Sequence, residues 1–223
     1  RVGSASINAS VASPTSAQDL TVSAKASHGL LNLVGVPEFD PSTITSGNTD
    51  SGSAGFGGSY HQLNLTGGAD ATVAQGATVH ADDVVVLANT NFDQVTVTEA
   101  AGKAGKVSIN GAFSLINSDI STIAQIASGS TLDVNNAVVQ ALDDSLVINV
   151  AGGVARSGSV GIGFSIAIND LDRDTRALIG NRSTESTTGG SLTAHGNVWL
   201  EAQAGSTQGA FTIAGSGPSG DQK

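Results

Sequence analysis

The sequence predicts an all-β protein, and more specifically a parallel β-helix (β-solenoid) with a loop insertion. The chain of 223 residues contains 29 Gly and only 4% aromatic residues, and Ala, Ser, Thr, Val and Asn are frequent. Short β-type runs alternate with Gly, Asn and Asp, which favour turns. No stretch keeps an apolar period of 3.6 residues, so helices are not expected.

A loose repeat supports this fold class. Runs of similar pattern begin at Asp19, Asp83, Asn136 and Asn197, which are separated by 64, 53 and 61 residues. A period in the fifties is typical of an array of supersecondary units. We expect quasi-repeats at about 51–101, 102–156 and 157–215. Each is long enough for two turns of a β-helix, and residues 1–223 are interpreted as a single solenoid segment of a longer chain.

The N-terminal part departs from the repeat. A short alternating strand is expected at Asp19–Ala24. Residues 25–50 then break the pattern, because Pro37 and Pro41 flank an acidic stretch and a Ser/Thr/Gly-rich run follows. We interpret 25–50 as an inserted loop, anchored by the short apolar run Leu30–Val34.

From residue 51 the strands recur in order. They are expected near Ser59–Leu65 and Asp83–Ala88, then Gly105–Ile116 and Asn136–Ala141, then Gly161–Ile168 and Asn197–Ala202. Alternate Val, Leu and Ala in these runs would fill a narrow core, as Val84, Val86 and Ala88 do in one copy. Phe56, Phe113 and Phe164 occupy similar places in three copies, which would let them stack.

The competing fold is an array of β-sandwich domains. Such domains need about 100 residues each and usually a core Trp or Tyr. The whole chain has one Trp and one Tyr, and its repeat is shorter. These counts favour the solenoid over the sandwich.

Composition also bounds the partners. The net charge of −10 argues against nucleic acid and against an anionic membrane surface. No apolar run approaches the about 18 residues of a membrane span, so this segment is not expected to insert into a membrane. The absence of Cys excludes disulfides and thiolate metal sites.

Alternating carboxylates are the strongest candidate for a binding site. Asp170, Asp172 and Asp174 offer the oxygen ligands that Ca²⁺ prefers. An EF-hand would require Gly and Glu where Thr175 and Asn181 stand, so that motif is absent. The alternative interpretation is a solvated turn between two strands. Ca²⁺ is therefore the one candidate cofactor.

Catalytic residues are not predicted. The doublets Asp82–Asp83 and Asp143–Asp144 are interpreted as turn residues, since Asp favours turns. Neither doublet alone makes an acid–base site, because adjacent side chains on a strand point to opposite faces. The histidines lack metal-binding spacing. They are His28, His61, His80 and His195. No nucleophile elbow or phosphate loop occurs. We therefore expect no enzyme; a β-helical polysaccharide-degrading enzyme is the third alternative.

Three segments carry a resemblance to a known family. Gly161–Asn169, Ala177–Gly180 and Gly190–Ala202 resemble the repeats of filamentous-haemagglutinin-like and leukotoxin-like large bacterial adhesins and of related autotransporter passengers. The resemblance implies a right-handed β-helical stalk of a secreted or surface-anchored adhesin involved in cell adhesion, biofilm formation or virulence. It carries over no catalytic residues.

The expected partners follow from that resemblance and from the residues. They are a host or bacterial cell-surface glycan or protein, and other copies of the chain that pair through exposed end coils. The alternative function is a ligand-binding module, in which the 25–50 insertion or the Asp170–Asp174 turn recognises a glycan, a protein or Ca²⁺.

Overall fold

The computed structural model describes residues 5–8, 18–35, 53–182 and 189–218, and their regular structure is entirely β-strand. The strands are β1 (Ser6–Ile7), β2 (Leu20–Val34), β3 (Ala54–Val73), β4 (Thr78–Ala104), β5 (Val107–Ile126), β6 (Thr131–Ser157), β7 (Val160–Ile179), β8 (Ser191–Ala194) and β9 (Val198–Pro218). The prediction of an all-β protein is confirmed for these residues.

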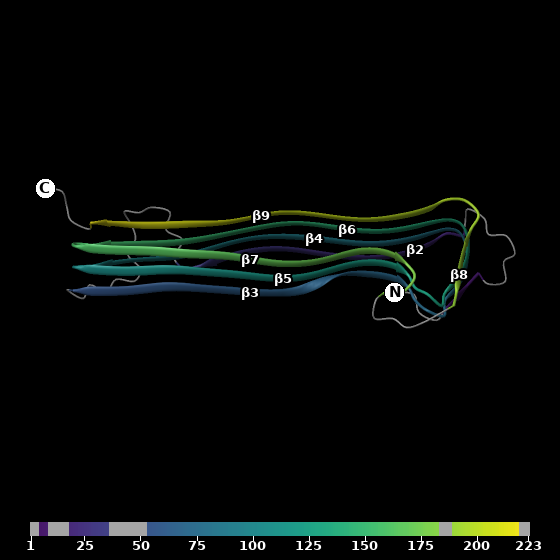
Figure 1. Ribbon diagram of the computed structural model, residues 1–223, viewed down its shortest axis with the longest axis horizontal. Coiled ribbons are helices and arrows are strands. Elements are labelled where there is room, and N and C mark those ends of the chain that lie inside the picture. The colour runs from purple at the N-terminus through teal and green to yellow at the C-terminus, as the bar shows by residue number, and fades with distance from the viewer. Residues whose placement is uncertain (1–4, 9–17, 36–52, 183–188, 219–223) are drawn as a thin grey trace.

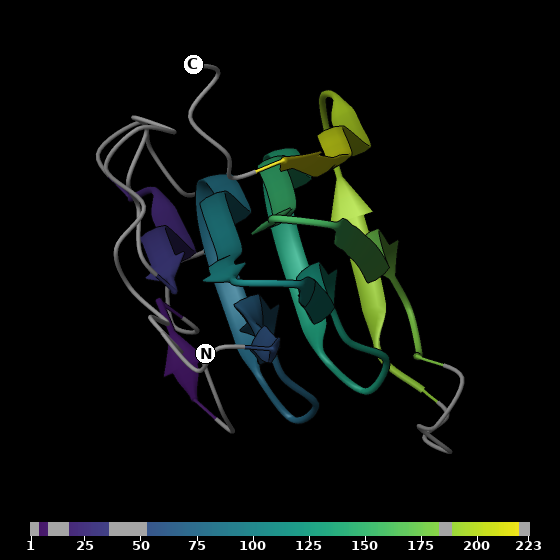
Figure 2. The ribbon, with the colours of Figure 1, turned by 90° about the vertical axis from the view of Figure 1, so that its left-hand side faces the viewer.

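The strands form two parallel sheets that face each other (Figures 1 and 2). Sheet A contains β3, β5 and β7 in that order. In sheet B, β4 and β6 lie at the centre, with β1 and β2 on one side and β8 and β9 on the other. The chain runs along sheet A and returns along sheet B, so that each long strand lies beside the strand of the preceding passage (Figure 1).

Each repeat unit supplies one long strand to each sheet. Three units can be followed, at 54–104, 107–157 and 160–218. Ala54 lies beside Val107 and Val107 lies beside Val160, so each strand of sheet A pairs with the equivalent strand of the next repeat unit. The sequence places the quasi-repeats at 51–101, 102–156 and 157–215. The expectation of two turns per repeat is wrong, because strands of 20 and 27 residues use up a whole unit.

One end of the molecule, which we call the base, is formed by the first residues of β4 and β6 and by β8. Sheet A ends here in turns whose third residue is Gly76 or Gly129, each with a φ of 80°. The amide of Ala77 donates to the Ala74 carbonyl (3.2 Å) and that of Ser130 to the Ala127 carbonyl (3.3 Å). These features define type II turns, which require a residue that tolerates positive φ at the third position.

A second corner at the base carries a ladder of Asp and Asn. The Asp83 amide donates to Asp19 Oδ1 (3.2 Å), and Asn136 Nδ2 donates to Asp83 Oδ1 (2.7 Å). The Asn197 amide then donates to Asn136 Oδ1 (2.9 Å). These four residues are the starts of the predicted runs, so the irregular spacing of 64, 53 and 61 residues is confirmed as structural register.

The core next to the base matches the predicted aliphatic ladders. Val84, Val86 and Ala88 are buried between the sheets, and Ala137, Val139 and Ala141 lie beside them on β6. Each buried methylene group contributes about 0.8 kcal/mol, so this cluster is the main source of stability at the base.

The opposite end, which we call the tip, lies where residues 105–106 and 158–159 connect the sheets. Here the backbones of the sheets approach closely. A Cβ atom added to Gly153 on β6 would lie 2.0 Å from the carbonyl oxygen of Phe164 on β7, and one added to Gly163 would lie 2.3 Å from that of Gly153. The inward-facing residues of β6 and β7 in this region are Gly, Ala, Ser and Asn, and the large apolar side chains of β7 face outward.

Two predictions about particular residues are corrected by this arrangement. Residues 25–34 of the predicted insertion belong to β2 and pair with β4 in an unbroken register. Residues 36–50 of the insertion lie outside the described residues. Phe56, Phe113 and Phe164 do not share one register position; instead Tyr60 stacks on Phe113, with ring centroids 5.4 Å apart.

Candidate functional site

The predicted Asp cluster lies within a strand. Asp170, Asp172 and Asp174 belong to the continuous strand β7, so the interpretation of this segment as a turn is wrong. All three occupy alternate positions on the outer face of sheet A, where successive carboxylates are about 7 Å apart along the strand. The Asp174 carboxylate forms an ion pair with Arg176.

Neighbouring repeat units bring further polar residues to Asp170 and Asp172. Asp172 lies beside Asp119 of β5, and Asp170 lies beside Asn117. Asn117 Nδ2 donates to Asn64 Oδ1 of β3 (2.8 Å). The separation of neighbouring strands is about 4.8 Å, which makes Asp119 and Asp172 like charges in direct proximity.

These rows line a groove on the outer face of sheet A with a volume of about 350 Å³. We call it the acidic groove, and it is lined by Asn64, Leu65, Thr66, Asn117, Ser118, Asp119, Asp170 and Asp172. Its lining contains no Lys or Arg, so its carboxylates have no counter-charge within it. Such a surface can accept hydrogen bonds from hydroxyl groups or attract a cation. Asp119, Asn64 and Asn117 were missed in the sequence, although each lies one 53-residue period from another member.

The doublet Asp143–Asp144 lies in the middle of β6, so its interpretation as a turn is wrong. The two side chains do point to opposite faces. Asp144 is exposed and lines a second groove of about 350 Å³ on sheet B, whereas Asp143 is buried between the sheets. Asp82–Asp83, in contrast, lies at the base corner, where the pairing of β4 with β6 skips Asp82.

Asp143 forms a buried ion pair that links the sheets. Arg173 Nε of β7 donates to Asp143 Oδ2 (2.7 Å) and Arg173 Nη2 donates to Oδ1. Thr175 Oγ1 contacts Asp143 Oδ2 (3.4 Å), and Thr122 Oγ1 donates to Thr90 Oγ1 (2.7 Å) beside the pair. The bidentate geometry positions both strands. This polar layer was not predicted, because its members come from four different strands.

Two of the four histidines meet at one carboxylate. His195 Nε2 lies 2.8 Å from Asp133 Oδ1, and His80 Nδ1 lies 3.8 Å from Asp133 Oδ2, on the outer side of the base. Within the described ranges no group of three or more His, Asp or Glu side chains has a geometry suited to a metal ion. The Ca²⁺ site at Asp170, Asp172 and Asp174 therefore stays a prediction.

Burial perturbs two titratable groups away from the acidic groove. Desolvation lowers the pKa of His61, whose Nδ1 lies 3.3 Å from Ser114 Oγ. Desolvation also raises the pKa of Glu99 on the outer face of sheet B. His61 belongs to sheet A and contacts Ser114, whereas Glu99 faces outward from sheet B.

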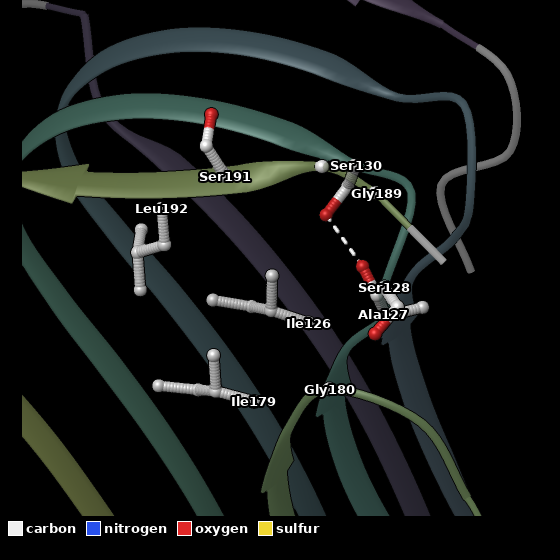
Figure 3. Close-up of a pocket in the computed structure, with 10 residues that line it drawn as sticks. Ile126, Ala127, Ser128, Ser130, Ile179, Gly180, Gly189, Ser191 and Leu192 are labelled. Carbon is white, nitrogen blue, oxygen red and sulfur yellow. Dashed lines mark hydrogen bonds between the residues drawn. The ribbon is translucent and has the colours of Figure 1, made fainter. Parts of the chain in front are cut away.

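A small cavity of about 120 Å³ lies at the base, next to β8 (Figure 3). It is lined by Ile126, Ala127, Ser128, Ser130, Ile179, Gly180, Gly189, Gly190, Ser191 and Leu192. Ser130 Oγ donates to the Ala127 carbonyl (2.6 Å) within it. The lining contains no ionisable side chain, so it offers no group for acid–base catalysis.

Comparison of the chain with protein-family models, curated proteins and solved structures found no match. None of the described residues forms a helix with the length and apolarity that a membrane crossing requires. Functional inference therefore depends on the architecture and surfaces of the chain.

Proposed function

We propose that the chain is a segment of a right-handed parallel β-helix that acts as a stalk or surface-presenting spacer in a large secreted bacterial adhesin of the filamentous-haemagglutinin-like kind. One observation carries the proposal. Val198 and Leu200 of the last repeat unit are 50% and 51% exposed, whereas Ala137 and Val139, their partners one unit earlier, are fully buried. Stacking of a further coil on β7 and β9 would cover these core-facing side chains, as in solenoid proteins.

The pairing within the sheets suits a spacer. Each long strand is hydrogen-bonded along its whole length to the strand of the next unit, as in the 27-residue strands β4 and β6. A structure in which each unit contacts only its neighbours transmits force along the stack and can be lengthened by added units. Contact with a cell-surface glycan or protein would then be made by surfaces that the stalk presents, and exposed end coils would pair with other copies.

A tandem protein tests whether the units stack. Residues 54–218 are placed directly after residue 220, so that two residues connect the copies, as at 105–106 and 158–159. The proposal predicts one cooperative thermal transition at a higher temperature than that of the single chain, because the junction adds an interface. Two transitions at the original temperature would refute it.

A matched substitution identifies the junction as the cause. Leu200→Lys in the first copy places a charge at the new interface and should remove the gain in melting temperature. The same substitution in the second copy lies at the free end and should leave the gain in place. Equal effects of the two variants would contradict stacking through β9.

Localisation is tested separately on the cells that produce the protein. Antibodies raised against the folded chain should label intact cells or the culture medium. Labelling confined to permeabilised cells would refute the secreted or surface-exposed location.

The acidic groove favours a second candidate, a ligand-binding module for a glycan, a protein or Ca²⁺ that includes Asp170 and Asp172. Thermal melts with and without about 1 mM Ca²⁺, a concentration suited to weak extracellular sites, test the cation. A Ca²⁺-dependent rise that disappears in Asp172→Asn but persists in Asp144→Asn, on the other sheet, would support binding in the groove. An unchanged melt would remove Ca²⁺ as a cofactor.

A further inference from the structure

The outer face of sheet A is divided into two chemically different halves. Beyond the acidic groove, towards the tip, every outward position from 54 to 62, 107 to 115 and 160 to 168 is uncharged. Most of these side chains are large and apolar, and we call this surface the apolar face. Its main members are Phe56, Tyr60, Ile109, Phe113, Leu115, Val160, Ile162, Phe164, Ile166 and Ile168.

The apolar face is strongly exposed. Phe56, Tyr60 and Phe164 are 74%, 62% and 51% exposed, and the aliphatic side chains of β7 are exposed by nearly half. With about 200 Å² for an aromatic side chain, the face presents roughly 700 Å² of apolar surface. The largest apolar patch of a typical monomer is about 300–600 Å². A face of this size is therefore expected to be covered by a partner.

The aromatic rings make the surface flat. The Phe164 ring lies over Gly111 of the neighbouring strand, where an added Cβ atom would be 2.0 Å from Phe164 Cζ. Tyr60 and Phe113 stack with an angle of 5° between their rings. A flat apolar sheet surface packs best against another sheet.

We infer that two copies of this chain pair face to face through the apolar face, with their strands antiparallel. The exposed area of the apolar face is close to the about 800 Å² that each partner buries in a standard protein interface. A two-fold axis gives each copy the same complementary surface. This pairing goes beyond the proposed stalk function and differs from association through end coils, which would use β7 and β9 as edges.

Charge selects the antiparallel arrangement. The acidic groove follows the apolar face directly, with Asp119 and Asp172 two rows beyond Leu115 and Ile168. Parallel strands would superpose the two acidic grooves, and like charges in contact cost affinity. Antiparallel strands superpose only the apolar faces and place the grooves at opposite ends of the dimer.

A lipid surface is the less favourable occupant. Among the described residues, the edge strand β7 of sheet A pairs only with β5. Backbone groups on the outer edge of β7 would lack hydrogen-bond partners in hydrocarbon, whereas they stay in water when two sheets pack face to face.

The test is the association state of the complete 223-residue chain, measured by sedimentation velocity between about 1 and 100 μM. Interfaces of this size bind with micromolar or tighter affinity, so a dimer would be formed within this range. Wild type should form dimers, and Ile166→Lys, at the centre of the apolar face, should remain monomeric with an unchanged circular dichroism spectrum. Phe211→Lys on the outer face of sheet B and Leu200→Lys on the end strand are matched controls that should still dimerise. A monomeric wild type, or loss of the dimer in Leu200→Lys but not in Ile166→Lys, would overturn the inference.

Spin labels determine the orientation. Because the chain contains no Cys, Asp119→Cys gives a single labelling site in each copy. Asp119 lies eight residues beyond Gly111, at the middle of the apolar face, which corresponds to about 26 Å along the strand. Antiparallel pairing therefore predicts a label separation of about 50 Å, from twice that distance. A separation under about 25 Å would overturn the antiparallel arrangement. Flotation of a monomeric wild type with phosphatidylcholine vesicles, lost in Ile166→Lys, would replace the second copy by a lipid surface.

Discussion

Removal of one member of the buried ion pair should destabilise the protein strongly. Asp143 is 3% exposed, and its carboxylate accepts two hydrogen bonds from the Arg173 guanidinium. In Arg173→Met the carboxylate keeps only the Thr175 contact at 3.4 Å. A buried charge left without its partner costs about 3–5 kcal/mol, a large part of the 5–15 kcal/mol of a typical domain.

The double variant Asp143→Leu/Arg173→Met is the decisive comparison. It removes both charges and leaves apolar side chains of similar volume, so its free energy of unfolding should lie within about 1–2 kcal/mol of wild type. Equilibrium unfolding in urea gives the four free energies of a double-mutant cycle. We expect a coupling energy of at least about 2 kcal/mol. A value below about 1 kcal/mol, as for surface pairs, would refute the interpretation of a desolvated pair that links the sheets.

Three further predictions concern stability. Glu99→Gln should raise the melting temperature at pH 7, because burial raises the pKa of this carboxyl above 4.5 and its ionisation opposes folding. The gain in melting temperature should shrink as the pH falls through the folded-state pKa of Glu99. A gain that does not depend on pH would contradict this prediction. Gly153→Ala should cost at least about 1–3 kcal/mol, since its Cβ would meet a backbone oxygen of β7, whereas Gly67→Ala, with no atom within 4 Å, should be nearly neutral in the same urea titration. Val86→Ala should lower the free energy of unfolding by about 2–3 kcal/mol. Leu200 is half exposed, so Leu200→Ala should lower it by about 1 kcal/mol or less. Equal losses would show that the last unit is covered in the isolated chain.

His61 should contribute to the loss of stability at acid pH. Its lowered pKa means that the unfolded chain binds the proton more readily, so stability is lost as the pH falls through the ordinary value of 6.5. His61→Asn should flatten this part of the curve in melts between pH 5 and 7.5. His195→Asn, at the exposed base, is the matched control, and an equal effect of both substitutions would contradict the assignment to His61.

Some residues of the acidic groove could be predicted from the sequence, and others could not. Asp170, Asp172 and Asp174 were found because they alternate along the chain, and that alternation places them on one face of β7. Asp119 and Asn64 come from neighbouring units, and their place in the groove follows only from a register of 53 residues. A loose period read from the sequence cannot supply a register, because a shift of one residue would turn these side chains to the other face.

Local residue chemistry alone was enough to determine the class of fold. Gly at the turns and Asp and Asn at the corners favour tight bends, and β-branched residues in alternating runs favour strands. The starts at Asp83, Asn136 and Asn197 mark the corner ladder, because an Asn side chain there bonds to the next unit.

Only the tertiary structure decided which side of β7 faces the core at the tip. Along β7, Gly161 and Gly163 alternate with Ile162 and Phe164, and hydrophobicity alone would place the larger residues inside. The sheets lie so close at the tip that a single Cβ on Gly163 would meet the backbone of the opposite sheet. The large side chains therefore point outward and form the apolar face. The separation of the sheets depends on residues from every unit of the stack, so it cannot be read from any one stretch of the chain.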